Sequence, residues 1–145
     1  MTTPTATDRG VPAIPREGDQ PAQMHKVEAI IRYERLQQVQ DALDEIGVSG
    51  LNVTEVKGCG RQKGYTEHYR GSEANISLLP KLKVESIVPA EITDRVVEAI
   101  VGAAYTGETG DGLLFVLPVS QAVRIRTGER GVDILRHQAP VGWGY

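Results

Sequence analysis

Three short segments of this 145-residue chain combine glycine with charge in the way that phosphate binding requires. The first, "GCGRQKG", places Gly58, Gly60 and Gly64 around Arg61 and Lys63. Glycine lets the backbone approach a ligand closely, and the two cations supply positive charge. Because the segment lacks the Walker arrangement, a basic surface turn without a ligand is the alternative interpretation.

The second segment, "TGETGDG", places Gly110 and Gly112 on either side of Asp111. Its flexible backbone can cradle a phosphate while the carboxylate takes a ligand hydroxyl. The structural interpretation is a helix C-cap at Gly107 followed by a hairpin-like turn. The two interpretations are compatible.

The third segment, "RIRTGERG", places Arg124 and Arg126 two residues apart. On an extended segment their side chains point the same way, and two guanidinium groups on one side suit a polyphosphate. The alternative is a solvated edge that resists aggregation.

Catalytic patterns do not stand out beside these segments. The three histidines, His25, His68 and His137, lie far apart and show no metal-ligand spacing. No nucleophile–base pair and no carboxylate pair is placed for acid–base chemistry. The sequence therefore favours ligand binding over catalysis.

The elements that must position these segments follow from hydrophobic periodicity. Strands are predicted over 26–33, 51–58, 82–89 and 113–118, and helices over 34–47 and 90–107. The predicted buried stripes are Leu36, Val39, Leu43 and Ile46 in the first helix, and Ile92, Val96, Ile100 and Ala103 in the second. Gly47 is expected to end the first helix.

A repeat organises these elements. "KVEAII" at 26–31 recurs as "KVESIV" at 83–88, and each copy opens a strand–helix–strand unit. Two such units in tandem are typical of the α+β ferredoxin-like double βαβ fold. We therefore expect a four-stranded antiparallel sheet with both helices on one face.

The other face of this sheet needs a cover, because "LLFVLP" at 113–118 is apolar without alternation. The two helices cannot cover both faces, and the ends of the chain are polar and rich in proline. The sequence therefore favours an oligomer that packs through its sheets.

Composition fits one compact domain, with 40% apolar residues, 24% charged residues and a net charge of −3, which does not favour nucleic acid. We expect a disordered tail over 1–23, a domain over 24–135 and a short tail over 136–145. The N-terminal segment lacks an apolar h-region, no run is long enough to span a bilayer, and the single cysteine fits a reducing compartment. These features predict a cytoplasmic protein.

Five segments together resemble the PII signal-transduction family, sensors of nitrogen and carbon status. They are "VTEVKGCGRQKG", "YRGSE", "LLPKLKVE", "TGETGDG" and "VRIRTGERG", in the family's order and spacing, and the resemblance covers residues 24 to about 135. It implies a homotrimer with nucleotide sites in the clefts between subunits, where ATP and ADP compete. It also implies a regulator rather than an enzyme.

The resemblance implies a role for many individual residues. The nucleotide-binding positions that it implies are Ile30, Gly58, Gly60, Arg61, Gln62, Lys63, Glu85, Gly110, Asp111, Gly112, Arg124 and Arg126. With ATP bound, Gln62 would hold Mg²⁺, and 2-oxoglutarate would bind beside it at Gln62, Gly64 and Lys81. Arg124 and Arg126 would reach across from the neighbouring subunit.

The long irregular stretch 57–83 resembles the family's T-loop, which changes shape with ligand and docks on targets such as an ammonium channel or nitrogen-assimilation enzymes. The sequence departs from the family at three positions. Ala74 stands where a modified tyrosine is usual, which excludes nucleotidylylation there, and Ser72 matches a serine phosphorylated in some members. Leu113 replaces a phosphate-contacting lysine. Cys59 replaces a phenylalanine; a redox-active thiol is one interpretation, and a small buried hydrophobe is the one that we favour.

Two other hypotheses stay open. One is a divergent PII paralogue that regulates carbon uptake or a transporter through a different effector, which Ala74, Leu113 and the long N-terminal segment motivate. The other is a slow nucleotide hydrolase, which the absence of a placed general base disfavours. Neighbouring genes would separate the first from a nitrogen sensor, and ATP turnover would reveal the second.

Overall fold

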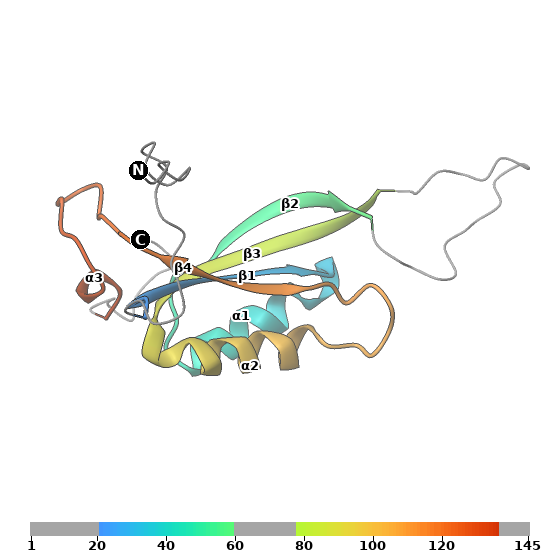
Figure 1. Ribbon diagram of the computed structural model, residues 1–145. Helices are drawn as coiled ribbons and strands as arrows, with labels where there is room; N and C mark the ends of the chain where they lie inside the picture. The colour runs from blue at the N-terminus through green and yellow to red at the C-terminus, as the bar shows by residue number, and fades with distance from the viewer. Residues whose placement is uncertain (1–20, 60–77, 137–145) are drawn as a thin grey trace, which may run out of the picture.

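The computed structural model describes residues 21–59 and 78–136, which form an antiparallel sheet backed by two helices (Figure 1). The main elements are β1 (Met24–Ile31), α1 (Leu36–Glu45), β2 (Asn52–Gly58), β3 (Leu79–Pro89), α2 (Thr93–Ala104), β4 (Leu114–Val119) and α3 (Asp133–Arg136). Short 3-10 turns, η2 (Tyr33–Arg35) and η3 (Ala90–Ile92), lead into α1 and α2. The strand order β2-β3-β1-β4 confirms the ferredoxin-like prediction.

The two copies of the repeated sequence form the central strands. β1 and β3 pair antiparallel, and the valine at the second position of each copy, Val27 or Val84, is fully buried. Both strands turn these residues toward α1 and α2, which cover one face of the sheet (Figure 1). The helix stripes are confirmed, because Val39, Leu43, Val96 and Ile100 are buried, while Leu36, Ile46, Ile92 and Ala103 pack around them.

The predicted C-cap of α2 at Gly107 is wrong. The helix ends at Ala104, and Tyr105 is already extended, with φ −67° and ψ 129°. The backbone amides of Thr106 and Gly107 instead donate to the carboxylate of Asp111. This carboxylate captures the donors that a further helical turn would have used.

β3 begins at Leu79, three residues earlier than predicted, and it includes Pro80. Over these first residues β3 pairs with β2 alone, because its pairing with β1 starts only at Leu82. A proline lacks an N–H donor, so it is tolerated where one side of the strand has no partner strand.

The sheet face opposite the helices is not covered by any described helix or strand (Figure 1). Register places Phe115 opposite Glu28 and Leu117 opposite Lys26, so both apolar side chains lie on this open face. Phe115 is 49% exposed and Leu117 is 40% exposed. The described chain thus leaves apolar strand surface in contact with solvent.

Candidate functional site

The loop that joins α2 to β4 is organised by the carboxylate of Asp111. Its oxygens accept hydrogen bonds from the Thr106 amide at 2.8 Å, the Gly107 amide at 2.9 Å and the Thr106 hydroxyl. Arg32, just after β1, donates from Nε to Asp111 at 3.0 Å and from Nη2 to the Thr109 carbonyl at 2.8 Å. The loop is therefore fastened to the end of the central strand.

These bonds change the titration of both partners. Partial burial by itself would raise the pKa of Asp111, but the Thr106 hydroxyl and amide, Arg32 and the Gly107 amide together hold it well below its usual range. The carboxylate raises the pKa of Arg32 in turn. Asp111 is therefore ionised at neutral pH, and its oxygens serve the loop rather than standing free for a ligand hydroxyl.

Gly112 can only be glycine. Its φ is +93°, and a Cβ there would lie 1.7 Å from the carbonyl oxygen of Ile30. The Ile30 amide also donates to the Leu113 carbonyl at 2.9 Å. The backbone of the loop therefore runs directly against β1, a contact that the glycine pattern alone did not predict.

Lys81 reaches the same loop from β3. Its Nζ donates to the Gly110 carbonyl at 2.5 Å, and only 9% of the residue is exposed. Burial and the nearby Arg32 lower the pKa of this ammonium group. Gly58 lies beside Lys81, because a Cβ on Gly58 would be 3.9 Å from the lysine Cγ. β1, β2, β3 and the loop thus meet at one end of the sheet.

An apolar cavity of about 230 Å³ lies against this loop. Ile30, Gly112 and Leu113 line it from one side, and Val101 and Tyr105 line it from the end of α2. Leu113 is 68% exposed, so it adds an apolar side chain to the rim where the family resemblance leads one to expect a lysine.

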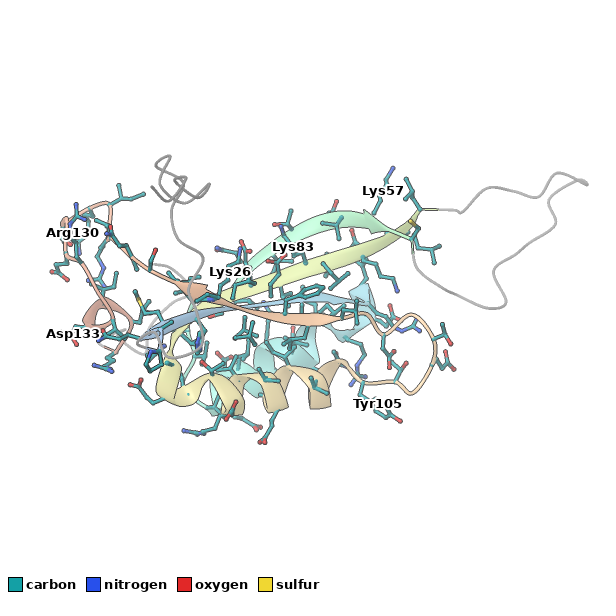
Figure 2. All side chains as sticks on the ribbon, viewed as in Figure 1. Lys26, Lys57, Lys83, Tyr105, Arg130 and Asp133 are labelled. Atoms are coloured by element: carbon teal, nitrogen blue, oxygen red, sulfur yellow. The ribbon has the colours of Figure 1, made fainter. Side chains whose placement is uncertain are left out.

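Glu85 lies further along the open face and is engaged in an ion-pair network. Lys26 contacts Glu28 at 3.3 Å and Glu85 at 3.4 Å, while Lys83 lies 3.8 Å from Glu28. Figure 2 shows Lys26 and Lys83 on the side of the sheet away from the helices. The two carboxylates raise the pKa of Lys26.

The predicted extended geometry of Arg124 and Arg126 is wrong. The chain closes a tight turn there, with the Gly128 amide donating to the Arg124 carbonyl at 2.7 Å. Gly128 adopts φ +75°, which closes the turn at little cost. Arg126 is exposed on this turn, while the Arg124 guanidinium donates to the Ile134 carbonyl at 3.0 Å.

The arginine turn, residues 123–130, and the loop at 105–113 lie at opposite ends of β4. Figure 2 shows Tyr105 at one end of the molecule and Arg130 and Asp133 at the other. The six residues of β4 alone separate them by about 20 Å. One chain therefore brings Ile30, Gly58, Lys81 and the 110–112 loop together, but it does not bring the two arginines to them.

Several predicted site residues lie outside the described residues: Gly60, Arg61, Gln62, Lys63, Gly64, Ser72 and Ala74. Cys59, which we expected to be buried, is exposed at the end of β2. Among the described residues, no group of three or more His, Cys, Asp or Glu side chains is gathered to hold a metal. None of the described helices is long and apolar enough to cross a membrane.

Sequence analysis missed Arg32 and Thr106, which hold the loop in place. A signal for Arg32 was present, because the predicted fold sets the end of the first strand beside the start of the fourth. A cation in that position faces Asp111, the acidic residue directly flanked by Gly110 and Gly112. Thr106 carried no comparable signal.

A four-stranded antiparallel sheet in the order β2-β3-β1-β4, backed by two helices, defines an α+β domain of the ferredoxin-like class. Comparison with known proteins specifies the family. The sequence model described as "Nitrogen regulatory protein P-II" matches residues 24–129. The chain therefore belongs to the nitrogen regulatory protein P-II family.

Individual relatives agree with this assignment. The chain is 56% identical over 110 residues to the nitrogen regulatory protein P-II of Rhodobacter capsulatus, which covers 76% of this chain and 98% of the relative. It is 52% identical over 106 residues to P-II 1 of Escherichia coli K12, with 73% and 95% covered. These relatives are described as regulatory proteins and not as enzymes.

A solved structure confirms the fold. The chain resembles the crystal structure of Arabidopsis thaliana PII bound to citrate with a TM-score of 0.63 and 41% sequence identity. The match covers 77% of this chain and 92% of that one.

Proposed function

We propose that this protein is a cytoplasmic, homotrimeric PII regulator that reads ATP, ADP and 2-oxoglutarate. It passes that information to nitrogen-metabolism targets, such as an ammonium channel or assimilation enzymes, through the T-loop. The predicted bounds of this loop, 57–83, were too wide, because the strands β2 and β3 include residues 57–58 and 79–83. The observation that carries the proposal is the preformed loop at 110–112. Arg32, Asp111 and Lys81 fasten this loop at the end of the sheet, and an anion can bind there without a further ordering cost.

The phosphates of the nucleotide would contact the backbone at Gly110 and Gly112 together with the "GCGRQKG" segment. Glycine backbone with exposed amides forms an anion-binding concavity, and the ammonium of Lys81 adds charge beside it. Ile30 and Glu85 would lie next to the rest of the nucleotide. The Asp111 carboxylate has a different role, because it holds the loop that carries those amides.

The arginines would come from a second copy of the chain. Arg126 is exposed, and the arginine turn lies one strand length away from the 110–112 loop. A trimer packed through the open sheet face would cover Phe115 and Leu117, and it would bring the arginine turn of one copy to the loop of the next. The nucleotide site is then shared between subunits.

The effector site would use Lys81, with Gln62 and Gly64. A dicarboxylate beside a triphosphate concentrates negative charge, so it needs Mg²⁺ at one end and an ammonium group at the other. The polycarboxylate citrate, bound to the Arabidopsis relative, supports this ligand class. Because ATP oxygens would complete the Mg²⁺ ligands, 2-oxoglutarate binding should require Mg-ATP.

Calorimetry with 2-oxoglutarate in the presence of Mg-ATP, and then of Mg-ADP, tests this function. We expect 2-oxoglutarate to give a heat of binding only in the presence of Mg-ATP. ATP and 2-oxoglutarate should each raise the affinity of the other by the same factor. Lys81→Gln should abolish the effector heat, while Lys57→Gln, on β2, serves as a matched control. Intact nucleotide binding with no 2-oxoglutarate heat would contradict the sensor function.

A second candidate is a divergent paralogue that regulates carbon uptake or a transporter with a different effector. The observation in its favour is Leu113, an exposed apolar side chain at the rim of the phosphate loop. Ala74 adds to it, because the usual modification by nucleotide transfer is impossible there. The calorimetric result above separates the two candidates.

A further inference from the structure

The short helix α3 lies against β3 and is joined to η3, at the start of α2, by an ion pair. Arg136 donates from Nε to Glu91 Oε1 at 2.9 Å, and its Nη2 lies 2.8 Å from the same oxygen. Glu91 belongs to η3, which leads directly into α2 and its buried stripe. The pair therefore joins the end of the described chain to a fixed part of the core.

The same helix holds the arginine turn. The Ile134 carbonyl in α3 accepts a hydrogen bond from Arg124, whose other nitrogen contacts Glu129 at 3.3 Å. The Gly131 amide donates to Ala122 at 3.0 Å and closes the base of the turn. A continuous series of contacts thus runs from Glu91 through α3 to the guanidinium of Arg124.

This arrangement is not part of the segment that the family model matches. That match ends at residue 129, whereas Ile134 and Arg136 lie beyond it. Arg136 also falls in the stretch that the sequence indicated as a C-terminal tail. The ion pair of Arg136 with Glu91 is therefore not assigned by the family match.

We propose that the Arg136–Glu91 pair is a latch that positions the arginine turn for the nucleotide of the neighbouring copy. Arg136 is a positioning residue here, because it acts through α3 and Arg124 and does not touch the ligand. The role rests on the proposed nucleotide site. The latch itself is a property of the isolated subunit and can be tested separately.

The latch should affect affinity more than stability. The two side chains are 45% and 53% exposed, and ion pairs at such exposure contribute little to the free energy of unfolding. A turn that is already held in place, however, loses less freedom when phosphate binds. Salt should weaken the latch, because exposed charges are screened.

A spin label on the turn measures the latch directly. Ile125 is fully exposed, so Ile125→Cys in a Cys59→Ser background carries the label without displacing a packed side chain. We expect Glu91→Gln and Arg136→Gln to increase label mobility. Arg136→Lys should increase label mobility less than Arg136→Gln does, because the lysine can still pair with Glu91. The charge-swapped double variant, Glu91→Lys with Arg136→Glu, should hold the label more firmly than Glu91→Lys or Arg136→Glu alone.

Asp133→Asn is the matched control, because Asp133 contacts the same arginine at 3.3 Å but lies on α3 itself. It should leave label mobility unchanged. An Arg136→Gln variant whose label is as immobile as in the parent would overturn the latch, whether or not the protein binds nucleotide.

Nucleotide titration of the same variants, without the label, tests the positioning role. We expect Arg136→Gln and Glu91→Gln to weaken ATP binding about three- to tenfold, with an unchanged melting temperature. Increased label mobility with unchanged affinity would overturn the positioning role. Failure of the unaltered protein to bind any nucleotide would contradict the proposed function, while the label would still report on the latch.

Discussion

Asp111 was expected to contact the ligand, but the structure gives its oxygens a different set of partners. Two backbone amides, a hydroxyl and Arg32 converge on this single carboxylate. Such convergence explains how a loop rich in glycine keeps one shape. At the residue scale, the site depends on groups that arrange the backbone as much as on groups that would touch phosphate.

Replacing Asp111 by asparagine should loosen this loop. Because hydrogen bonds to a charged group contribute about 1.5–3 kcal/mol, we expect the free energy of unfolding to fall by about 1–3 kcal/mol and nucleotide affinity to fall with it. Glu108→Gln, an exposed change in the same loop, should do neither. Denaturant unfolding and titration of both variants measure the difference.

The same comparison has a defined pH dependence. The folded pKa of Asp111 lies below its ordinary value of 3.8, so its contribution to stability is complete above that value and is lost as the pH falls toward the folded pKa. The difference in the free energy of unfolding between wild type and Asp111→Asn should stay constant from about pH 5 to 8 and shrink only below about pH 4. A gap that varies near neutral pH would show that another group is responsible.

Gly112 gives a sharper test of the close approach to β1. Gly112→Ala places a methyl group where it would lie 1.7 Å from the Ile30 carbonyl, so the loop must move and nucleotide binding should be lost. Gly102→Ala, in the exposed part of α2, meets nothing within 4 Å and should raise stability by about 0.5–1 kcal/mol. Equal behaviour of the two variants would contradict the backbone geometry.

At the scale of elements, local sequence predicts most of what the structure contains. Periodicity predicts the four strands, both helices and their buried stripes, because each pattern reports the face that a segment presents to the core. The errors lie where a side-chain contact, a strand-pairing pattern or a turn glycine overrides the hydrophobic pattern. Asp111 ends α2 early, one-sided pairing admits Pro80 into β3, and Gly128 folds the arginine segment into a turn.

The candidate site shows the same division. Glycine spacing predicted the loop at 110–112, and the family resemblance predicted that Lys81 belongs to the same site. Arg32 could be predicted only from the arrangement of the strands in the sheet, which sets the end of β1 beside the loop. No sequence pattern predicted the hydrogen bond between Arg124 and α3. The Arg32–Asp111 contact joins residues 79 positions apart, which explains the first omission; the Arg124–Ile134 contact spans ten residues but involves a backbone carbonyl, which the residue types do not reveal.

The two arginines of the turn should respond differently to replacement. Arg126 is exposed, so Arg126→Ala should weaken nucleotide binding by about 1.5–3 kcal/mol without changing stability. Arg124 also donates to Ile134, so Arg124→Ala should weaken binding and also release the turn from α3. Calorimetry together with thermal melting separates these effects. Full nucleotide affinity in Arg126→Ala would mean that Arg126 is only a solvent-exposed surface residue.

At the scale of the whole molecule, the main feature is the open sheet face, which no described helix or strand of the chain covers. It carries a balanced set of charges, with two lysines and two glutamates in contact, beside the apolar side chains of β4. Charges that are already paired cost less to bury than isolated ones. The face is therefore suited to packing against a second copy.

We expect light scattering to show a trimer for the unaltered protein and smaller species for Leu117→Lys. A new ammonium group at this position would lie opposite Lys26 on a face whose glutamates are already paired, so burying it in an interface would be unfavourable. Val101→Lys alters a similarly exposed apolar residue on α2 and should leave the trimer intact. Dissociation by Val101→Lys but not by Leu117→Lys would place the interface on the helical face.

A mixed trimer tests most directly whether the nucleotide site is shared between copies. One subunit carries Arg124→Ala and Arg126→Ala, the other carries Gly112→Ala, and two affinity tags select assemblies that contain both. In each mixed trimer, one site combines the intact loop of the first kind of subunit with the intact turn of the second kind. We therefore predict about one nucleotide per mixed trimer at wild-type affinity, while trimers made of either kind of subunit alone do not bind. No binding in the mixed trimer would contradict the shared site and confine nucleotide binding to a single chain.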